Sequence, residues 1–109
     1  SPLVGCGYYA DDGAGAASAT GDGDVMANYC TSKHIVERMG EGMHPQEACR
    51  DLMRYMSRYS PDLHTDMYCV IAINPHGEIG ALSMNAQQPL QYALWRNGHG
   101  ALHTAPHYL

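Results

Sequence analysis

The segment Thr20-Gly21-Asp22-Gly23-Asp24 has the residue types and spacing best suited to chemistry in this chain. It follows a run of small residues and precedes an apolar pattern of helical spacing, so we expect a strand that turns into a helix. Such a junction offers the Thr20 hydroxyl, free backbone N–H groups and the positive end of a helix dipole together. These groups can stabilise an oxyanion or bind a carboxylate. Ordinary strand–helix junctions look the same, so this pattern alone indicates little about function.

A second set of residues, His99, His103 and His107, recurs every four positions near the end of the chain. On a helix this spacing would align three imidazoles for a metal ion. Nearby glycines and Pro106 disfavour a helix, so we predict that the final dozen residues are irregular and exposed. The Asp22-Gly23-Asp24 segment also lacks the remaining ligands of a calcium loop. We therefore expect no metal site.

The charge of the chain argues against nucleic acid as a partner. It has six Lys and Arg against eleven Asp and Glu, a formal net charge of −5, whereas a phosphate backbone requires clustered cations. Arg50, Arg54 and Arg58 form a helical stripe, but Glu47 and Asp51 can pair with it, which favours a solvated face. No segment approaches the roughly 20 apolar residues of a membrane span, and no signal-peptide pattern opens the chain.

The elements that must position these residues can be predicted from hydrophobic spacing. Ala48, Leu52, Tyr55, Met56 and Tyr59 define one apolar face of a helix. The predicted elements are strands at 3–9 and 14–20, helices at 25–40 and 45–59, and strands at 67–73, 78–84 and, more weakly, 91–95. The order β-β-α-α-β-β-(β) lacks the alternation of a parallel sheet. We predict an α+β fold, a single domain over residues 1–109 with the helices on one side of an antiparallel sheet.

Turn and cap residues support these boundaries. We expect turns at residues 11–13 and 20–24, with Asp24 capping the first helix and Gly40 ending it. Asn74-Pro75-His76-Gly77 predicts a hairpin turn.

The four cysteines, Cys6, Cys30, Cys49 and Cys69, show no CxxC spacing, which argues against a zinc ribbon or finger. If all are paired, three disulfide connectivities are possible. Buried free thiols that act as small apolar residues are the alternative.

The run from Ser1 to Asp24 resembles the β-subunit of glycosylasparaginases, within the wider family of plant-type asparaginases and isoaspartyl peptidases. The matching pieces are Ser1-Pro2, the segment from Gly5 to Asp12 and the segment from Gly15 to Asp24. The helix with Glu47-Ala48-Cys49 and the hairpin around residues 77–81 also fit. The resemblance covers most of the chain, and its first 24 residues are the specific part.

The resemblance implies an N-terminal nucleophile fold, an αββα sandwich whose precursor cleaves itself to expose a catalytic Thr. In the family, the amino group of that Thr is the general base and its hydroxyl attacks the amide carbonyl. Carried over by position, the Thr20 hydroxyl and the Gly21 N–H would bind the oxyanion. Gly21 and Gly23 would lie in the substrate-binding region, Gly23 as a structural neighbour.

The family's nucleophilic Thr, and the Arg and Asp that hold the substrate, align before Ser1. We therefore expect the nucleophile to lie outside this chain, on the N-terminal part of a β-subunit. Together with an α-subunit, that part would complete an (αβ)2 assembly. Ser1 is not expected to be the nucleophile, because it aligns with an internal Ser and Pro2 would rigidify it.

These expectations describe a part of an amidohydrolase that cleaves the side-chain amide of asparagine or of N-glycosylated asparagine, without metal or organic cofactor. One alternative is an isoaspartyl peptidase and L-asparaginase, and another is a non-catalytic relative that serves as a structural or binding component. The family's animal members suggest a Cys49–Cys69 disulfide and a lysosomal or secreted location. Free thiols and a cytoplasmic location are the alternatives, and Cys6 and Cys30 are expected in the core.

Overall fold

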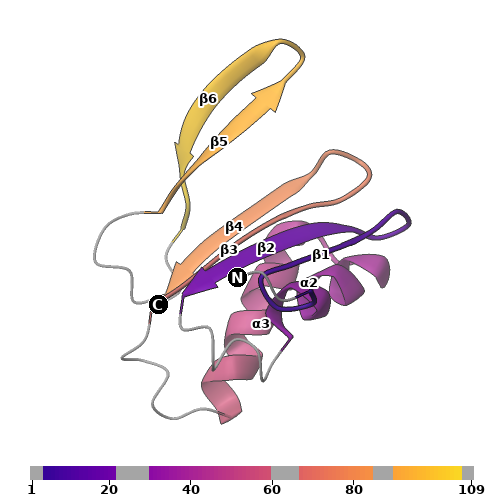
Figure 1. The fold of residues 1–109 in the computed structure, drawn as a ribbon, viewed down its shortest axis with the longest axis vertical. Coiled ribbons are helices and arrows are strands. Elements are labelled where there is room, and N and C mark those ends of the chain that lie inside the picture. The colour runs from indigo at the N-terminus through magenta and orange to yellow at the C-terminus, as the bar shows by residue number, and fades with distance from the viewer. Residues whose placement is uncertain (1–3, 22–29, 60–66, 85–89, 107–109) are drawn as a thin grey trace.

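The computed structural model describes residues 4–21, 30–59, 67–84 and 90–106 (Figure 1). In chain order, its elements are β1 (Tyr8–Asp11), β2 (Gly15–Gly21), α2 (Thr31–Gly40), α3 (Pro45–Tyr59), β3 (Tyr68–Ile73), β4 (Ile79–Met84), β5 (Gln91–Arg96) and β6 (His99–Thr104). Strands β1 to β4 form one antiparallel sheet in that order, and β5 pairs with β6 in a separate antiparallel hairpin. The predicted combination of helices with antiparallel sheet is confirmed.

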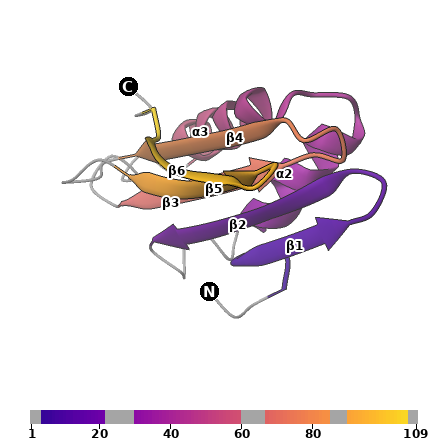
Figure 2. The ribbon, with the colours of Figure 1, turned by 90° about the horizontal axis from the view of Figure 1, so that it is seen from above.

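Both helices lie along one face of the four-stranded sheet (Figure 2). Helix α3 begins and ends where the sequence predicts, with Pro45 at its start, Glu47 in the first turn and Arg58 in the last. Its predicted apolar face is buried at Leu52 and Met56, whereas Tyr55 is 43% exposed. The helix packs so closely on β4 that a Cβ at position 80 would collide with the Pro45 backbone, so glycine is required there.

The core lies between the helices and the inner face of the sheet. Its side chains alternate along each strand with those of the opposite face, as the pleat of a strand dictates. The inner residues are Ala17 and Ala19 of β2, Tyr68, Val70 and Ala72 of β3, and Leu82 and Met84 of β4. They pack against residues of the two helices that are almost fully buried, among them Ile35, Val36, Leu52, Met53 and Met56.

The opposite side of the sheet, which we call the open face, carries three rows of directly paired residues. These rows are Thr20–Cys69–Ser83, Ser18–Ile71–Ala81 and Ala16–Ile73–Ile79. No helix covers this face within the described residues, and Ile71 and Ile73 remain 42% and 44% exposed.

The outer edge of β4 is held by groups from two distant segments. The Gln46 side chain donates to the Ala81 carbonyl (2.9 Å) and accepts from the Ala81 N–H (3.0 Å). The Ser83 N–H donates to the Pro106 carbonyl, just after β6 (3.1 Å). These bonds satisfy backbone groups that an edge strand would otherwise leave free, and the second ties the β5–β6 hairpin to the sheet.

Three predictions about the secondary structure are wrong, two of them about where an element begins. Residues 5–7 form a turn, and β1 begins only at Tyr8. The expected helix from residue 25 to 40 cannot be continuous, because Cys30 adopts a left-handed backbone conformation (φ 47°) and α2 begins at Thr31. Residues 25–29, and Asp24 as a cap, lie outside the described residues.

The third correction concerns the C-terminal segment, which was expected to be irregular. Residues 99–104 form β6, paired with β5 along its whole length. All six residues of β6 are exposed, as expected, whereas Ala105, which follows it, is buried, contrary to the expected exposure. Among the described residues, no helix is both long and apolar enough to cross a bilayer.

Candidate active site at the end of the second strand

Thr20 and Gly21 are the last two residues of β2, where the sequence predicted a turn. Both are exposed, and they pair with Cys69 and Tyr68 at the start of β3. Gly21 has φ 141°, and a Cβ at this position would collide with the Met67 carbonyl oxygen. Glycine therefore lets the strand end approach its neighbour closely while its backbone remains accessible.

The Thr20 side chain borders a cavity of about 260 Å³ between the open face and β5. Its polar lining residues include Ser18 from β2, Cys69 from β3 and Gln91 and Tyr92 from β5. The Thr20 hydroxyl therefore borders a hollow beside neutral side chains that can donate and accept hydrogen bonds.

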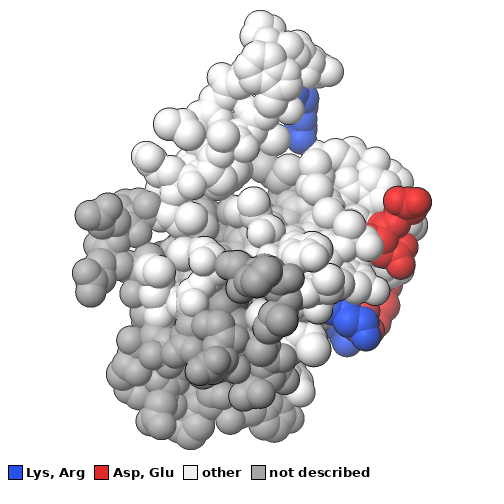
Figure 3. Space-filling view, viewed as in Figure 1, with Lys and Arg blue, Asp and Glu red and all other residues white. Residues whose placement is uncertain are grey.

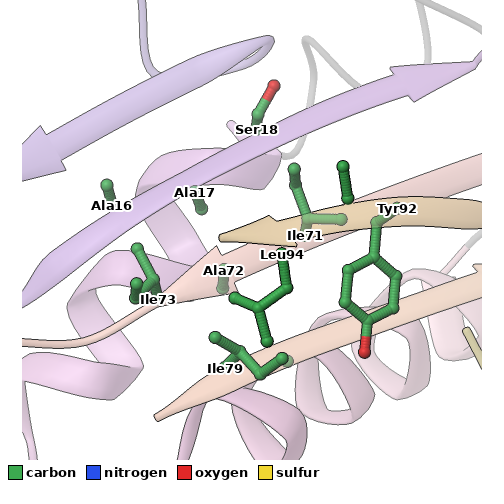
Figure 4. Close-up of a pocket in the computed structure, with 11 residues that line it drawn as sticks. Ala16, Ala17, Ser18, Ile71, Ala72, Ile73, Ile79, Tyr92 and Leu94 are labelled. Carbon is green, nitrogen blue, oxygen red and sulfur yellow. The ribbon is translucent and has the colours of Figure 1, made fainter. Parts of the chain in front are cut away.

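A second cavity, of about 270 Å³, adjoins the first along the same face (Figure 4). The two share Ser18, Ile71, Tyr92 and Ala93, so Tyr92 stands at their boundary. Apolar side chains line most of the second cavity: Ala16, Ile71, Ile73, Ile79 and Leu94. The combined hollow is mostly apolar, with more polar side chains at the Thr20 end than at the other.

The site is electrically neutral in the described part of the chain. No Lys, Arg, Asp or Glu is among the described residues that line either cavity, and the charged residues seen in Figure 3 lie toward one side of the molecule. Burial raises the pKa of the Cys69 thiol, which keeps it protonated and uncharged. Any negative charge that developed here would be stabilised by neutral hydrogen-bond donors such as the Thr20 hydroxyl.

The N–H and hydroxyl groups at the N-terminus of α2 are already bonded within the chain, whereas the helix start predicted at residue 25 lies outside the described residues. The Thr31 and Ser32 hydroxyls donate to the Cys6 carbonyl (2.8 and 2.6 Å). The Ser32 and Lys33 N–H groups donate to the Cys6 and Gly5 carbonyls (3.2 and 2.9 Å). Because the turn at residues 5–7 caps these groups, no anion is needed to satisfy them.

Several predicted site residues fall outside the described residues: Gly23, its neighbours Asp22 and Asp24, and Ser1. Nothing in the structure therefore bears on the substrate-binding role expected of Gly23.

The cysteine predictions are corrected in part. Cys49 and Cys69 are free thiols, so the expected disulfide between them is not formed. Cys6 is buried in the core, as expected, whereas Cys30 is exposed at the start of α2. The Cys49 side chain lies in the helical core, and burial raises its pKa to about 12.

Two members of the histidine series, His99 and His103, are described, and His107 lies outside the described residues. His99 and His103 lie on β6, and the His103 ring stacks on Tyr92 with centroids 5.5 Å apart and an interplanar angle of 24°. Across the described part of the chain, no three His, Cys, Asp or Glu side chains are arranged to hold a metal ion.

Sequence reasoning missed the side chains that surround Thr20. Ser18 could have been found from the alternation along β2, because it lies two residues before Thr20 on the same face. Cys69 and Tyr92 could not, because their place depends on the β2–β3 register and on how the hairpin folds back.

Comparison with known proteins gives a consistent result. The family model described as asparaginase matches residues 1–103. A protein of Drosophila grimshawi with N(4)-(beta-N-acetylglucosaminyl)-L-asparaginase in its name is 44% identical over 81 residues, which cover 74% of this chain and 20% of the relative. The rat protein of that name is 39% identical over 77 residues, 71% of this chain and 22% of the relative.

A plant protein is similarly close. An Arabidopsis thaliana protein named for isoaspartyl peptidase and L-asparaginase is 40% identical over 76 residues, 70% of this chain and 20% of that protein. The chain thus spans about a fifth of the length of the curated relatives it matches.

Proposed function

Because the chain belongs to the asparaginase family, we propose that it forms part of an amidohydrolase that cleaves the side-chain amide of asparagine or of N-glycosylated asparagine. The observation that carries this proposal is the position of Thr20 and Gly21. They end β2 together, exposed, and Thr20 borders a neutral hollow in the segment that resembles the family's oxyanion site.

In the proposed reaction, a nucleophile attacks the amide carbonyl, and its oxygen gains negative charge as the tetrahedral intermediate forms. The Thr20 hydroxyl and the Gly21 N–H would donate hydrogen bonds to that oxygen. The nucleophile would be a Thr at the start of a β-subunit, outside this chain, whose α-amino group takes up the hydroxyl proton. No metal or organic cofactor enters this scheme.

The open face supports the further proposal that this chain is one part of an αββα sandwich. Ile71 and Ile73 are more than two-fifths exposed there, although isoleucine is usually buried in sheets. The rest of the protein would cover this face and place the nucleophile opposite Thr20. An α-subunit and the N-terminal part of the β-subunit, joined in an (αβ)2 assembly after self-cleavage, would be its source. A lysosomal or secreted location would accompany this function.

The similarity to the Arabidopsis protein favours a second candidate, hydrolysis of isoaspartyl peptides and free asparagine. Both candidates use the same acyl-transfer chemistry and differ in the group attached to the amide nitrogen. Rates with asparagine, a glycosylated asparagine and a β-aspartyl dipeptide would rank them.

The experiment that tests the role of Thr20 compares three forms of the full-length, assembled protein. Thr20→Ala removes the hydroxyl and should lower kcat about 100-fold, as expected for the loss of one oxyanion donor. Thr20→Ser keeps the hydroxyl and should stay within about fivefold of the native rate. Thr104→Ala, which alters an exposed threonine on β6, is the matched control.

An inactive native assembly would overturn the proposed function and favour a structural or binding role. An active assembly in which Thr20→Ala has the native kcat would overturn only the assignment of Thr20.

A further inference from the structure

Gly21, the backbone donor of the proposed oxyanion site, ends β2 without a partner on β1. Ala19, two residues earlier, donates its N–H to the Gly7 carbonyl on the β1 side (2.9 Å). In an antiparallel sheet, alternate residues of a strand direct their N–H groups to the same neighbouring strand. The Gly21 N–H therefore points toward the β1 side, beyond the place where β1 begins.

The chain leaves the β1–β2 ladder before it reaches Gly21. In the register that pairs Tyr8 with Ser18, an extended β1 would bring Gly5 opposite Gly21. Gly5 instead adopts φ 92° in the turn before β1, and both of its backbone groups are bonded elsewhere. Its N–H donates to the Tyr8 carbonyl (2.8 Å), and its carbonyl accepts from the Lys33 N–H (2.9 Å). The turn thereby keeps a strand carbonyl away from the Gly21 N–H.

The start of α2 holds this turn with two hydroxyls. Thr31 and Ser32 are fully buried, and their hydroxyls donate to the Cys6 carbonyl at the centre of the turn (2.8 and 2.6 Å). The Ser32 N–H donates to the same carbonyl (3.2 Å). A buried hydroxyl without a partner is costly, so the turn cannot move from α2 toward β2 without a loss of stability.

The same turn also fixes β2 just before the proposed donors. The Gly7 carbonyl accepts from the Ser18 hydroxyl (3.1 Å) as well as from the Ala19 N–H. On its other side, β2 is held by the pairing of Thr20 with Cys69 of β3. The end of β2 is thus held from both sides, and a donor fixed in advance needs no reorganisation when negative charge develops.

We propose that Thr31 and Ser32 are positioning residues for the oxyanion donor. By holding the turn at residues 5–7 on α2, their hydroxyls keep the Gly21 N–H unpaired by β1 and fixed in place. Both side chains are fully buried, so they act through the turn and not by contact with the substrate. This inference rests on the proposed amidohydrolase function and adds the residues that hold its backbone donor.

The test measures kcat and KM of the full-length, assembled protein with L-asparagine, N4-(β-N-acetylglucosaminyl)-L-asparagine and a β-aspartyl dipeptide. The double variant Thr31→Val/Ser32→Ala removes both hydroxyls. It should lower kcat about tenfold on every substrate that the native protein hydrolyses, with KM within about twofold, because a displaced donor weakens transition-state stabilisation more than substrate binding. Thr31→Ser retains the hydroxyl and should keep kcat within about twofold of the native value.

Val36→Ala is the matched control, since it removes methyl groups from a buried residue of the same helix that does not bond to the turn. It should destabilise the fold and leave kcat unchanged.

The outcomes separate this inference from the function on which it rests. An active native protein whose double variant has the native kcat overturns the positioning role alone. An equal loss of kcat in Val36→Ala also overturns it, because general destabilisation of α2 would then be the cause. A change confined to KM would assign the turn to substrate binding and overturn its action on the oxyanion donor.

A native protein that hydrolyses none of the three substrates overturns both proposals. If the double variant fails to assemble, Thr31→Val and Ser32→Ala decide separately. Each should lower kcat about threefold, and native kcat in both would refute the positioning role.

Discussion

The two faces of the four-stranded sheet differ at Ile71 and Ile73, where the open face is exposed, although Ala81 and Ser83 on that face are buried. On the helical face, Val70 and Leu82 are each 1% exposed, and Leu52 of α3 is fully buried against the sheet. On the open face, the neighbouring Ile71 is 42% exposed and borders a cavity. Val70 and Ile71, adjacent residues of β3, therefore face a packed core on one side of the sheet and an incompletely covered surface on the other.

This difference separates folding from function in the molecule. Helices α2 and α3, together with Cys6 of the turn at residues 5–7, bury the inner face of the sheet within the described part of the chain. Thr20, whose hydroxyl is proposed to bind the oxyanion, borders the hollow on the open side. The helical layer therefore holds the sheet rigid, and the open face receives what the reaction requires from elsewhere.

The largest expected effect is on the helical face. Leu52→Ala should destabilise the protein by about 2–5 kcal/mol, because it leaves a cavity in a fully packed core. The midpoint of chemical denaturation of the assembled protein measures this change. An effect below about 1 kcal/mol would mean that α3 is not the principal cover of the sheet.

Adjacent substitutions on β3 compare the faces directly. Val70→Ala should cost about 2 kcal/mol on the helical face. Ile71→Ala should cost at least as much in the full-length assembly, because we propose that the rest of the protein buries the open face. Denaturation midpoints of the two variants provide the comparison. A cost for Ile71→Ala below about 1 kcal/mol would show that the open face stays exposed to water.

Cys49 gives a smaller effect that depends on pH. Its pKa rises from 9.0 to about 12 on burial, so the folded state retains a proton that the unfolded chain releases above pH 9. The stabilisation from this protonated thiol is therefore fully present below pH 9 and is lost as pH rises towards 12. The loss amounts to about 1 kcal/mol by pH 10.

The measurement is the change in unfolding free energy between pH 8 and pH 10 in the native protein and in Cys49→Ala. The variant is expected to lose about 1 kcal/mol less over this interval, whatever its stability at pH 8. Equal losses in the two proteins would show that the Cys49 thiol is not buried in the assembly.

The sequence predicted the elements whose limits are set by local residues and missed those set by distant ones. Helix α3 was predicted to the residue, because its apolar spacing, Pro45 and Glu47 all act locally. The start of α2 was not, because its cap comes from carbonyls of residues 5 and 6, far away in the chain. Strand β6 was missed because glycines and exposed histidines hide a strand that has no buried face.

Only part of the candidate site was predicted from the sequence. Thr20 and Gly21 were identified from their resemblance to a family motif, which depends on a short continuous segment. Cys69 and Tyr92 reach the same hollow only through strand register and the position of the hairpin. Tyr55 shows the converse error, since helical spacing placed it in the core although it lies 43% exposed beside His34 (ring centroids 5.4 Å).

The smallest expected effects on stability come from charged residues on the outer, solvent-facing surface of the two helices. Asp51 accepts a hydrogen bond from His34 (3.0 Å) and lies near Arg38 (3.8 Å), so it links α2 to α3. Among the described residues, Glu37 pairs only within α2, with Lys33 at 3.6 Å, and both side chains are at least half exposed.

Asp51→Asn should therefore cost about 1 kcal/mol and Glu37→Gln less than about 0.5 kcal/mol, since an exposed pair within one helix is screened by water. Denaturation midpoints at low and high salt measure both, and salt should reduce the difference between the variants. If Glu37→Gln instead matched Asp51→Asn, a partner would have to cover the outer surface of α2, and the helical side would be as incomplete as the open face.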